Sequence, residues 1–180
     1  MPGRPSVAPV YPVPVNSSRH RHAVLSALAV LITVAGCSSA DDSASAAVPR
    51  PDAKVTELCQ NLDEALPAKV DGESRDDPEP ASELTAGWGG VAIILRCGVE
   101  RPPKMTDPRV ANGNDADAVP GGVNGVDWLM ETRGDDVQRF TTANREAYVE
   151  VEVADGRDST GVLIDLAPAL KKTIPEGIAP

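Results

Sequence analysis

The sequence predicts an α+β domain: a small antiparallel sheet of about four strands, with an N-terminal and a C-terminal helix packed on one face. Three observations predict this class. An apolar stripe with helical spacing opens the ordered region at 51–67, a second one closes it at 162–175, and apolar stretches with a period of two lie between them. One disulfide is expected to join the first helix to the sheet.

Residues 1–36 have the features of a bacterial export signal. Arg19 and Arg21 precede AVLSALAVLITVAG (23–36), which carries no charge. A membrane span needs roughly 20 apolar residues, so this run is short for a span and typical of a signal peptide. The small residues at its end precede Cys37 directly, which resembles a lipobox. We expect a lipidated Cys37 at the outer face of the cell membrane, with a non-lipidated signal or a buried helix as the alternatives.

The next segment, 37–50, is rich in Ser, Ala and Asp and is predicted to be a flexible tether. Residues 51–180 then fit one domain. Cleavage before Cys37 removes three of the 17 basic residues and none of the 27 acidic ones, so the net charge changes from −10 to about −13. It also removes His20 and His22, the only histidines of the chain.

The first expected element is the helix at 51–67, with Asp52 as its N-cap and Pro67 as its stop. Its apolar stripe comprises Val55, Cys59, Leu62 and Leu66. A polar loop at 71–83 leads to a strand at 89–98, on which Cys97 and Arg96 point to opposite faces. With Cys37 lipidated, Cys59 and Cys97 form the one possible disulfide of an exported protein. Two reduced, buried thiols are the alternative.

The rest of the domain is predicted from turn residues and alternation. A long segment at 98–125 is rich in Pro, Gly, Asn and Asp and is expected to be a loop that is either functional or disordered. Strands are expected at 125–132, 137–142 and 146–153. In the closing helix, Pro168 is tolerated if Asp165 caps a helix that starts late.

Composition excludes several function classes. The acidic chain lacks the basic clusters that bind nucleic acid. Without histidine, the mature chain has no Ser-His-Asp or Cys-His arrangement and no usual zinc site. No phosphate-binding glycine motif is present, and no cofactor or metal is expected. A hydrolase with two carboxylates stays possible because acidic residues are abundant.

Three features are candidate binding sites. Trp88 precedes two glycines and is either an exposed ring that stacks on a ligand or a ring that covers the core. Arg96 either pairs with an acidic residue on the outer face of the sheet or binds an anionic ligand. The segment NGNDADA (112–118) has carboxylates but not the spacing of an EF-hand calcium loop.

Several motifs occur together in an order that resembles a known family. They are ALPAKVDG, WGGVAIILRCG, VNGVDWL, YVEV and DLAPALKKTIPEG. Together they resemble an actinobacterial lipoprotein family known only as a domain of unknown function. The resemblance implies an exported lipoprotein and no particular activity.

These observations lead to one expectation and two alternatives. We expect a membrane-anchored lipoprotein whose domain is a non-catalytic accessory or binding domain at the cell envelope, with an envelope protein as its partner. A binder of small ligands or ions that uses the 98–125 loop is the first alternative. The two-carboxylate hydrolase is the second.

Overall fold

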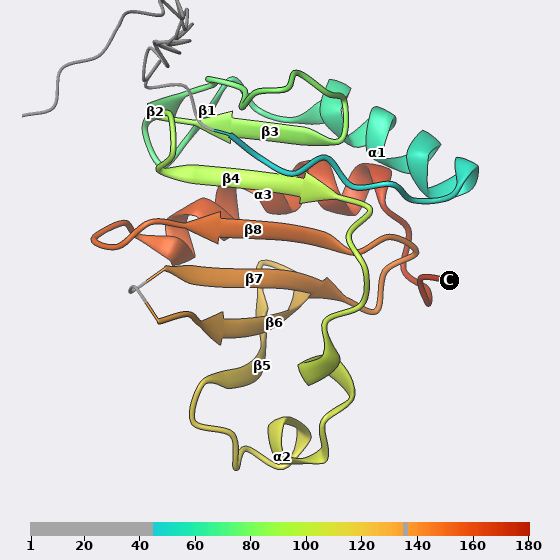
Figure 1. Cartoon of the computed structure of the whole chain (residues 1–180), viewed down its shortest axis with the longest axis vertical. Coiled ribbons are helices and arrows are strands. Elements are labelled where there is room, and N and C mark those ends of the chain that lie inside the picture. The colour runs from blue at the N-terminus through green and yellow to red at the C-terminus, as the bar shows by residue number, and fades with distance from the viewer. Residues whose placement is uncertain (1–44, 135–136) are drawn as a thin grey trace, which may run out of the picture. The chain divides into compact units, whose positions relative to one another are not determined.

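The computed structural model describes residues 45–134 and 137–180. The predicted signal peptide, Cys37 and the first part of the tether lie outside the described residues. The main sheet has six antiparallel strands in the order β3-β4-β8-β7-β6-β5 (Figure 1). These strands are β3 (Thr85–Trp88), β4 (Ile93–Cys97), β5 (Ala118–Val123), β6 (Val126–Thr132), β7 (Gln138–Ala143) and β8 (Val149–Val153). A separate hairpin pairs β1 (Lys69–Val70) with β2 (Glu73–Ser74).

The α+β class and the antiparallel sheet are confirmed, but the predicted strand number is wrong. The expected sheet lacked β3 and β5, which form its two edges. β5 contains Pro120, Gly121 and Gly122, residue types that are rare in strands. An edge strand tolerates proline because one of its sides makes no ladder hydrogen bonds.

β3 shows no alternation of apolar and polar residues, in part because position 87 has to be a glycine without a side chain. The backbone of Asp76 lies directly on it, with the Asp76 N–H donating to the Gly87 carbonyl at 2.9 Å. A Cβ at this glycine would stand 2.5 Å from the Asp76 oxygen. A side chain there would therefore displace the neighbouring main chain.

The arrangement of the helices also differs from the prediction. α3 (Ser159–Thr173) contacts β5, β6 and the small hairpin, whereas α1 (Ala53–Ala65) packs mainly along α3 (Figure 1). α3 therefore buries a wide stripe, made of Val162, Leu163, Leu166, Ala167, Ala169 and Leu170. Two short helices, η1 (Pro103–Thr106) and α2 (Pro108–Ala111), were not expected.

The start of α1 is confirmed, and the start predicted for α3 is wrong. Asp52 Oδ1 accepts the Val55 N–H at 3.0 Å, as an N-cap does. α3 instead begins at Ser159 and holds Pro168 in its interior. Pro168 has no N–H for the Ile164 carbonyl, and the Asn124 side-chain amide donates to that carbonyl at 3.4 Å.

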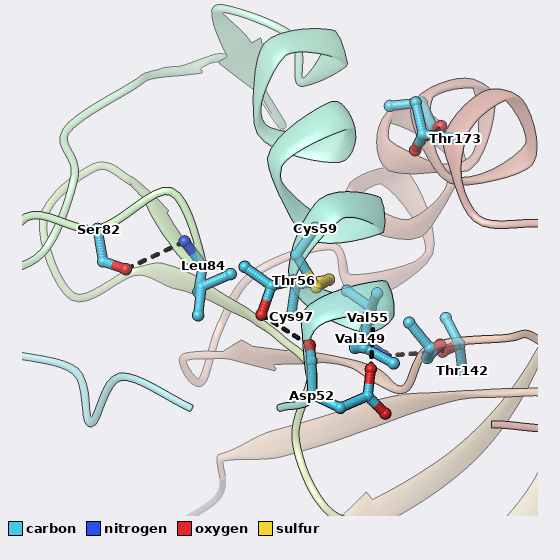
Figure 2. Close-up of a disulfide and its surroundings, with 12 residues drawn as sticks. Asp52, Val55, Thr56, Cys59, Ser82, Leu84, Cys97, Thr142, Val149 and Thr173 are labelled. Atoms are coloured by element: carbon cyan, nitrogen blue, oxygen red, sulfur yellow. Dashed lines mark hydrogen bonds between the residues drawn. A yellow bond between two sulfur atoms is a disulfide. The ribbon is translucent and has the colours of Figure 1, made fainter. Parts of the chain in front are cut away.

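The predicted disulfide between Cys59 and Cys97 is present (Figure 2). Both cysteines are 1% exposed, and they connect α1 to β4 within the main core. Through this bond α1 is joined to a sheet that it otherwise contacts little.

The segment 98–125 is ordered, which corrects the expectation of a structureless loop. It contains η1, α2 and β5, and Val110, Ala118 and Leu129 form a second small core with Met105 beside it. Local hydrogen bonds stabilise this segment. Asp107 Oδ1, for example, accepts the Arg109 N–H at 2.8 Å and so caps α2.

Residues 45–50, expected as part of the tether, lie against the domain. Ser45 forms a parallel bridge with Glu79, and the Ala46 N–H donates to the Glu79 carbonyl at 3.1 Å. These are main-chain contacts, which composition does not reveal. In the part of the chain that the structure describes, no helix is both long and apolar enough to cross a membrane.

Candidate functional site

The face of the main sheet that points away from α3 carries charged side chains. Arg96 of β4 lies opposite Glu150 of β8, and Arg139 of β7 lies opposite Glu152. Because side chains alternate along a strand, all four point away from the helix-covered core, into which Val149 and its neighbours point. The outer face therefore has an ion-pair network at its centre.

Glu150 is the centre of this network and is 4% exposed. The Arg96 guanidinium donates two hydrogen bonds to Glu150 Oε1, one of them from Nε at 2.9 Å. Arg139 Nε lies 3.2 Å from Glu150 Oε2, and Arg139 Nη2 donates to Glu152 at 2.9 Å. Of the two roles considered for Arg96, the structure shows the pairing with an acidic residue of the sheet.

Trp88 lies within the core of the domain. Its side chain is 0% exposed, and its Nε1 donates to the Pro67 carbonyl at 3.0 Å. The ring therefore covers core residues and presents no face on which a ligand could stack.

A groove of about 450 Å³ lies over the outer face of the sheet, and we call it the arginine groove. One wall is the segment that precedes α1, and the other is the segment that follows β4. Figure 1 shows the course of these two segments. It is lined by residues 47–50 and 98–103 together with Arg96, Glu131, Arg133, Arg139 and Glu150. The groove thus brings together three parts of the chain that lie far apart in sequence.

Arg101, in the second wall, is held by an uncharged partner. Its Nε donates to the Tyr148 hydroxyl at 2.7 Å, and its Cζ lies 5.7 Å from the centre of the Tyr148 ring. Among the described residues, no carboxylate forms an ion pair with Arg101. Its positive charge is therefore oriented but not neutralised.

Two buried polar atoms on the outer face have no hydrogen-bond partner in the described part of the chain. One is Glu131 Oε2, whose residue lines the groove. The other is Thr141 Oγ1, opposite Glu150 in the sheet. Buried polar groups are normally paired, so the atom on Glu131 marks a place where a donor from a ligand or from solvent would be favourable.

In the segment 112–118, Asp115 is engaged by basic side chains and is not free for calcium. Asp115 Oδ1 accepts a hydrogen bond from Lys104 Nζ at 2.7 Å, and Asp115 Oδ2 lies 3.5 Å from the Arg109 guanidinium. The hydrogen bond from Lys104, followed by one from the Asp117 N–H, lowers the pKa of Asp115. Within the ranges the structure describes, no three His, Cys, Asp or Glu side chains are arranged to hold a metal ion.

Sequence reasoning named one of the groove's charged residues, Arg96, and missed Arg101, Arg139 and Tyr148. Part of the signal was available, because Arg96 and Glu150 occupy outward positions of strands with clear alternation. Nothing in the sequence placed Arg101 beside Tyr148, since that contact depends on the path of the chain after β4.

Comparisons with known proteins give a family and no activity. No curated protein and no solved structure matches the chain significantly. A family model described as "Protein of unknown function (DUF3515)" matches residues 22–179, which is most of the chain. The chain belongs to this DUF3515 family.

Proposed function

We propose that the protein is an exported lipoprotein, anchored through a lipid on Cys37 at the outer face of the cell membrane, and that its domain is a non-catalytic binding domain of the cell envelope. The arginine groove is the observation that carries the binding role. Its volume of about 450 Å³ falls within the range of small-molecule sites. Its charged groups come from both walls and from the strands of the sheet.

The chemistry of the groove favours binding over catalysis. General acid–base catalysis needs a group that exchanges a proton near the working pH, and arginine does not. Glu150 and Glu152 are each paired with arginine, so neither is free to donate a proton. A two-carboxylate hydrolase, the enzymatic alternative, needs one carboxyl group that donates a proton and a second carboxylate across the substrate. In the groove, Glu131 is the buried carboxyl group with an oxygen that has no partner among the described residues.

The number of residues between Cys37 and the domain limits how far an anchor would reach. Ser45, which forms a bridge with Glu79, is eight positions after Cys37. Eight residues span at most about 29 Å when fully extended. A lipid on Cys37 would therefore keep the domain near the membrane surface, within reach of a membrane-attached envelope protein.

Fractionation of cells that express the wild type or Cys37→Ala tests the anchor. We expect the wild type in the membrane fraction, with the mass of a diacylglycerol group on Cys37, and the variant in the soluble extracytoplasmic fraction. A variant that stays with the membrane, together with a wild type that lacks lipid mass, would contradict the lipoprotein assignment.

Crosslinking in intact cells tests the binding role. A photo-reactive residue at exposed Glu100, in the wall of the groove, should capture an envelope protein. The same residue at Lys172, on the exposed face of α3, is the matched control. Equal capture from both positions, or none from either, would count against a binding surface at the groove.

A further inference from the structure

We propose that the arginine groove binds a small organic oxyanion, which carries a phosphate or carboxylate group together with a hydrogen-bond donor such as a hydroxyl. This inference rests on the proposed binding role and deepens it by naming the ligand chemistry. It does not depend on the lipid anchor.

The distribution of charge is the first argument. Nine arginines occur in residues 45–180, and five of them line the groove, against three glutamates. The whole chain has a net charge of −10. A local excess of positive charge in an acidic protein attracts anions to that place and not to the surrounding surface.

The floor of the groove does not supply this excess. Arg96 and Arg139 are both bound by Glu150, and Arg139 is bound by Glu152 as well. These pairs hold one another in fixed positions and leave the floor close to neutral. Outside the floor, Arg50, Arg101 and Arg133 stand against Glu100 and Glu131. None of these three arginines forms an ion pair with another described residue.

Arg101 is the residue best prepared for an oxyanion. The Tyr148 hydroxyl accepts a hydrogen bond from Arg101 Nε at 2.7 Å. Tyr148 itself is 7% exposed, so its position is well fixed. The two terminal nitrogens stay available, and they form the planar fork that suits phosphate and carboxylate. Because the guanidinium is already oriented, little side-chain entropy is lost when the ligand binds.

Glu131 supplies the reason to expect a donor on the ligand. Its Oε2 is buried without a partner among the described residues, and the residue, which belongs to β6, lines the groove and two neighbouring pockets. An oxyanion alone would be repelled by this carboxylate, whereas a ligand hydroxyl or amino group would donate to it. A phosphate or carboxylate on a hydroxylated or aminated carbon skeleton would satisfy both Arg101 and Glu131.

Calorimetric titration of the full-length protein, extracted from membranes in a neutral detergent, tests the proposal. The probes are glycerol 1-phosphate, citrate and inorganic phosphate, with chloride at equal ionic strength as the reference. We expect glycerol 1-phosphate or citrate to bind more tightly than inorganic phosphate, and chloride not to bind. Binding of none of the oxyanions above the chloride reference would overturn the proposal.

Variants test whether anion binding depends on the groove or only on the overall charge of the protein. Arg101→Lys keeps the charge but removes the fork, and should weaken binding about tenfold. Tyr148→Phe keeps the ring and every charge, and should weaken binding several-fold because Arg101 loses its hydrogen bond. Arg109→Lys, at an exposed arginine of α2 outside the groove, is the matched control and should bind as the wild type does. Equal weakening in all three variants would overturn the assignment to the groove.

A reconstitution experiment distinguishes two sources of the same chemistry. If a lipid headgroup is the ligand, glycerol 1-phosphate should bind more weakly to protein in phosphatidylglycerol vesicles than to protein in phosphatidylcholine vesicles. If a free anion is the ligand, the two affinities should be equal. Failure of all anion titrations would leave the fractionation of Cys37→Ala and the crosslinking unchanged, so the two proposals fail separately.

Discussion

Different interactions stabilise the two faces of the main sheet. The inner face packs against α3, with Val149 and Val151 of β8 and Leu166 of α3 fully buried and the disulfide at one end. Among the described residues, the outer face is covered by chain segments without regular structure and by two short helices, and its centre is a network of arginines and glutamates. Hydrophobic burial has no preferred direction, whereas ion pairs need particular partners. The inner face therefore provides stability, and the outer face carries the proposed binding site.

The largest effect is expected from the disulfide. Replacing both Cys59 and Cys97 with alanine opens a loop with a sequence separation of 38. In the chain-entropy model this lowers the free energy of unfolding by about 4 kcal/mol. Urea denaturation of the variant and of the wild type with dithiothreitol should give the same loss. A variant as stable as the oxidised wild type would show that α1 is held by packing alone.

The second effect tests burial on the inner face. Leu166→Ala removes a side chain of α3 that is 0% exposed, and should cost about 3 kcal/mol of unfolding free energy. Ile164→Ala, two positions earlier on the same helix and 46% exposed, should change stability by less than about 0.5 kcal/mol. Similar losses at the two positions would mean that the helix faces are assigned incorrectly.

The third effect tests the outer face. Glu150→Gln removes the charge that Arg96 and Arg139 share, and should lower the free energy of unfolding by about 2 kcal/mol. Glu146→Gln breaks the exposed pair with Lys54, which lies at 2.8 Å, and should leave denaturation close to that of the wild type. If the two variants lower the free energy of unfolding equally, burial of the ion-pair network contributes nothing to stability.

The smallest expected effect is a loss of stability at acidic pH, when Asp115 takes up a proton. The pKa of Asp115 lies below its usual value of 3.8, first because Lys104 Nζ donates to it and then because the Asp117 N–H does. A lowered pKa in the folded state stabilises the fold at every pH above the unfolded value, and this stabilisation is lost as the pH falls through the folded pKa. Carboxyl carbon NMR titration should place the Asp115 midpoint below 3.8, and Lys104→Met should raise it. A midpoint that the variant leaves unchanged would remove Lys104 as the cause.

Much of the fold could be predicted because it depends on local patterns. The Asp52 cap, the alternation in β8 and the pairing of Cys59 with Cys97 each follow from residue type and spacing. The failures occurred where a neighbour overrode local preference. β5 forms from glycine and proline because β6 supplies its hydrogen bonds, and α3 continues through Pro168 because Asn124 lies beside Ile164.

The candidate site was predicted less well than the fold. Arg96 was identified from its outward position, but the groove also needs residues 47–50, which were expected in the tether, and residues 98–103, which were expected in a loop. Both segments lack periodicity, so no pattern reports where they lie. Their positions depend on main-chain contacts such as that of Ala46 with Glu79.

The sequence by itself determined the α+β class and the disulfide, together with the expectation of an export signal with Cys37 at its end. If that signal is cleaved, the mature chain has no histidine. Each of these depends on residues close together in the chain or on composition. Only the tertiary structure decided that six strands pair, that Trp88 is buried and that Arg101 is held by Tyr148. Contacts between residues separated by 47 positions arise from the closing of the fold, which local propensity does not encode.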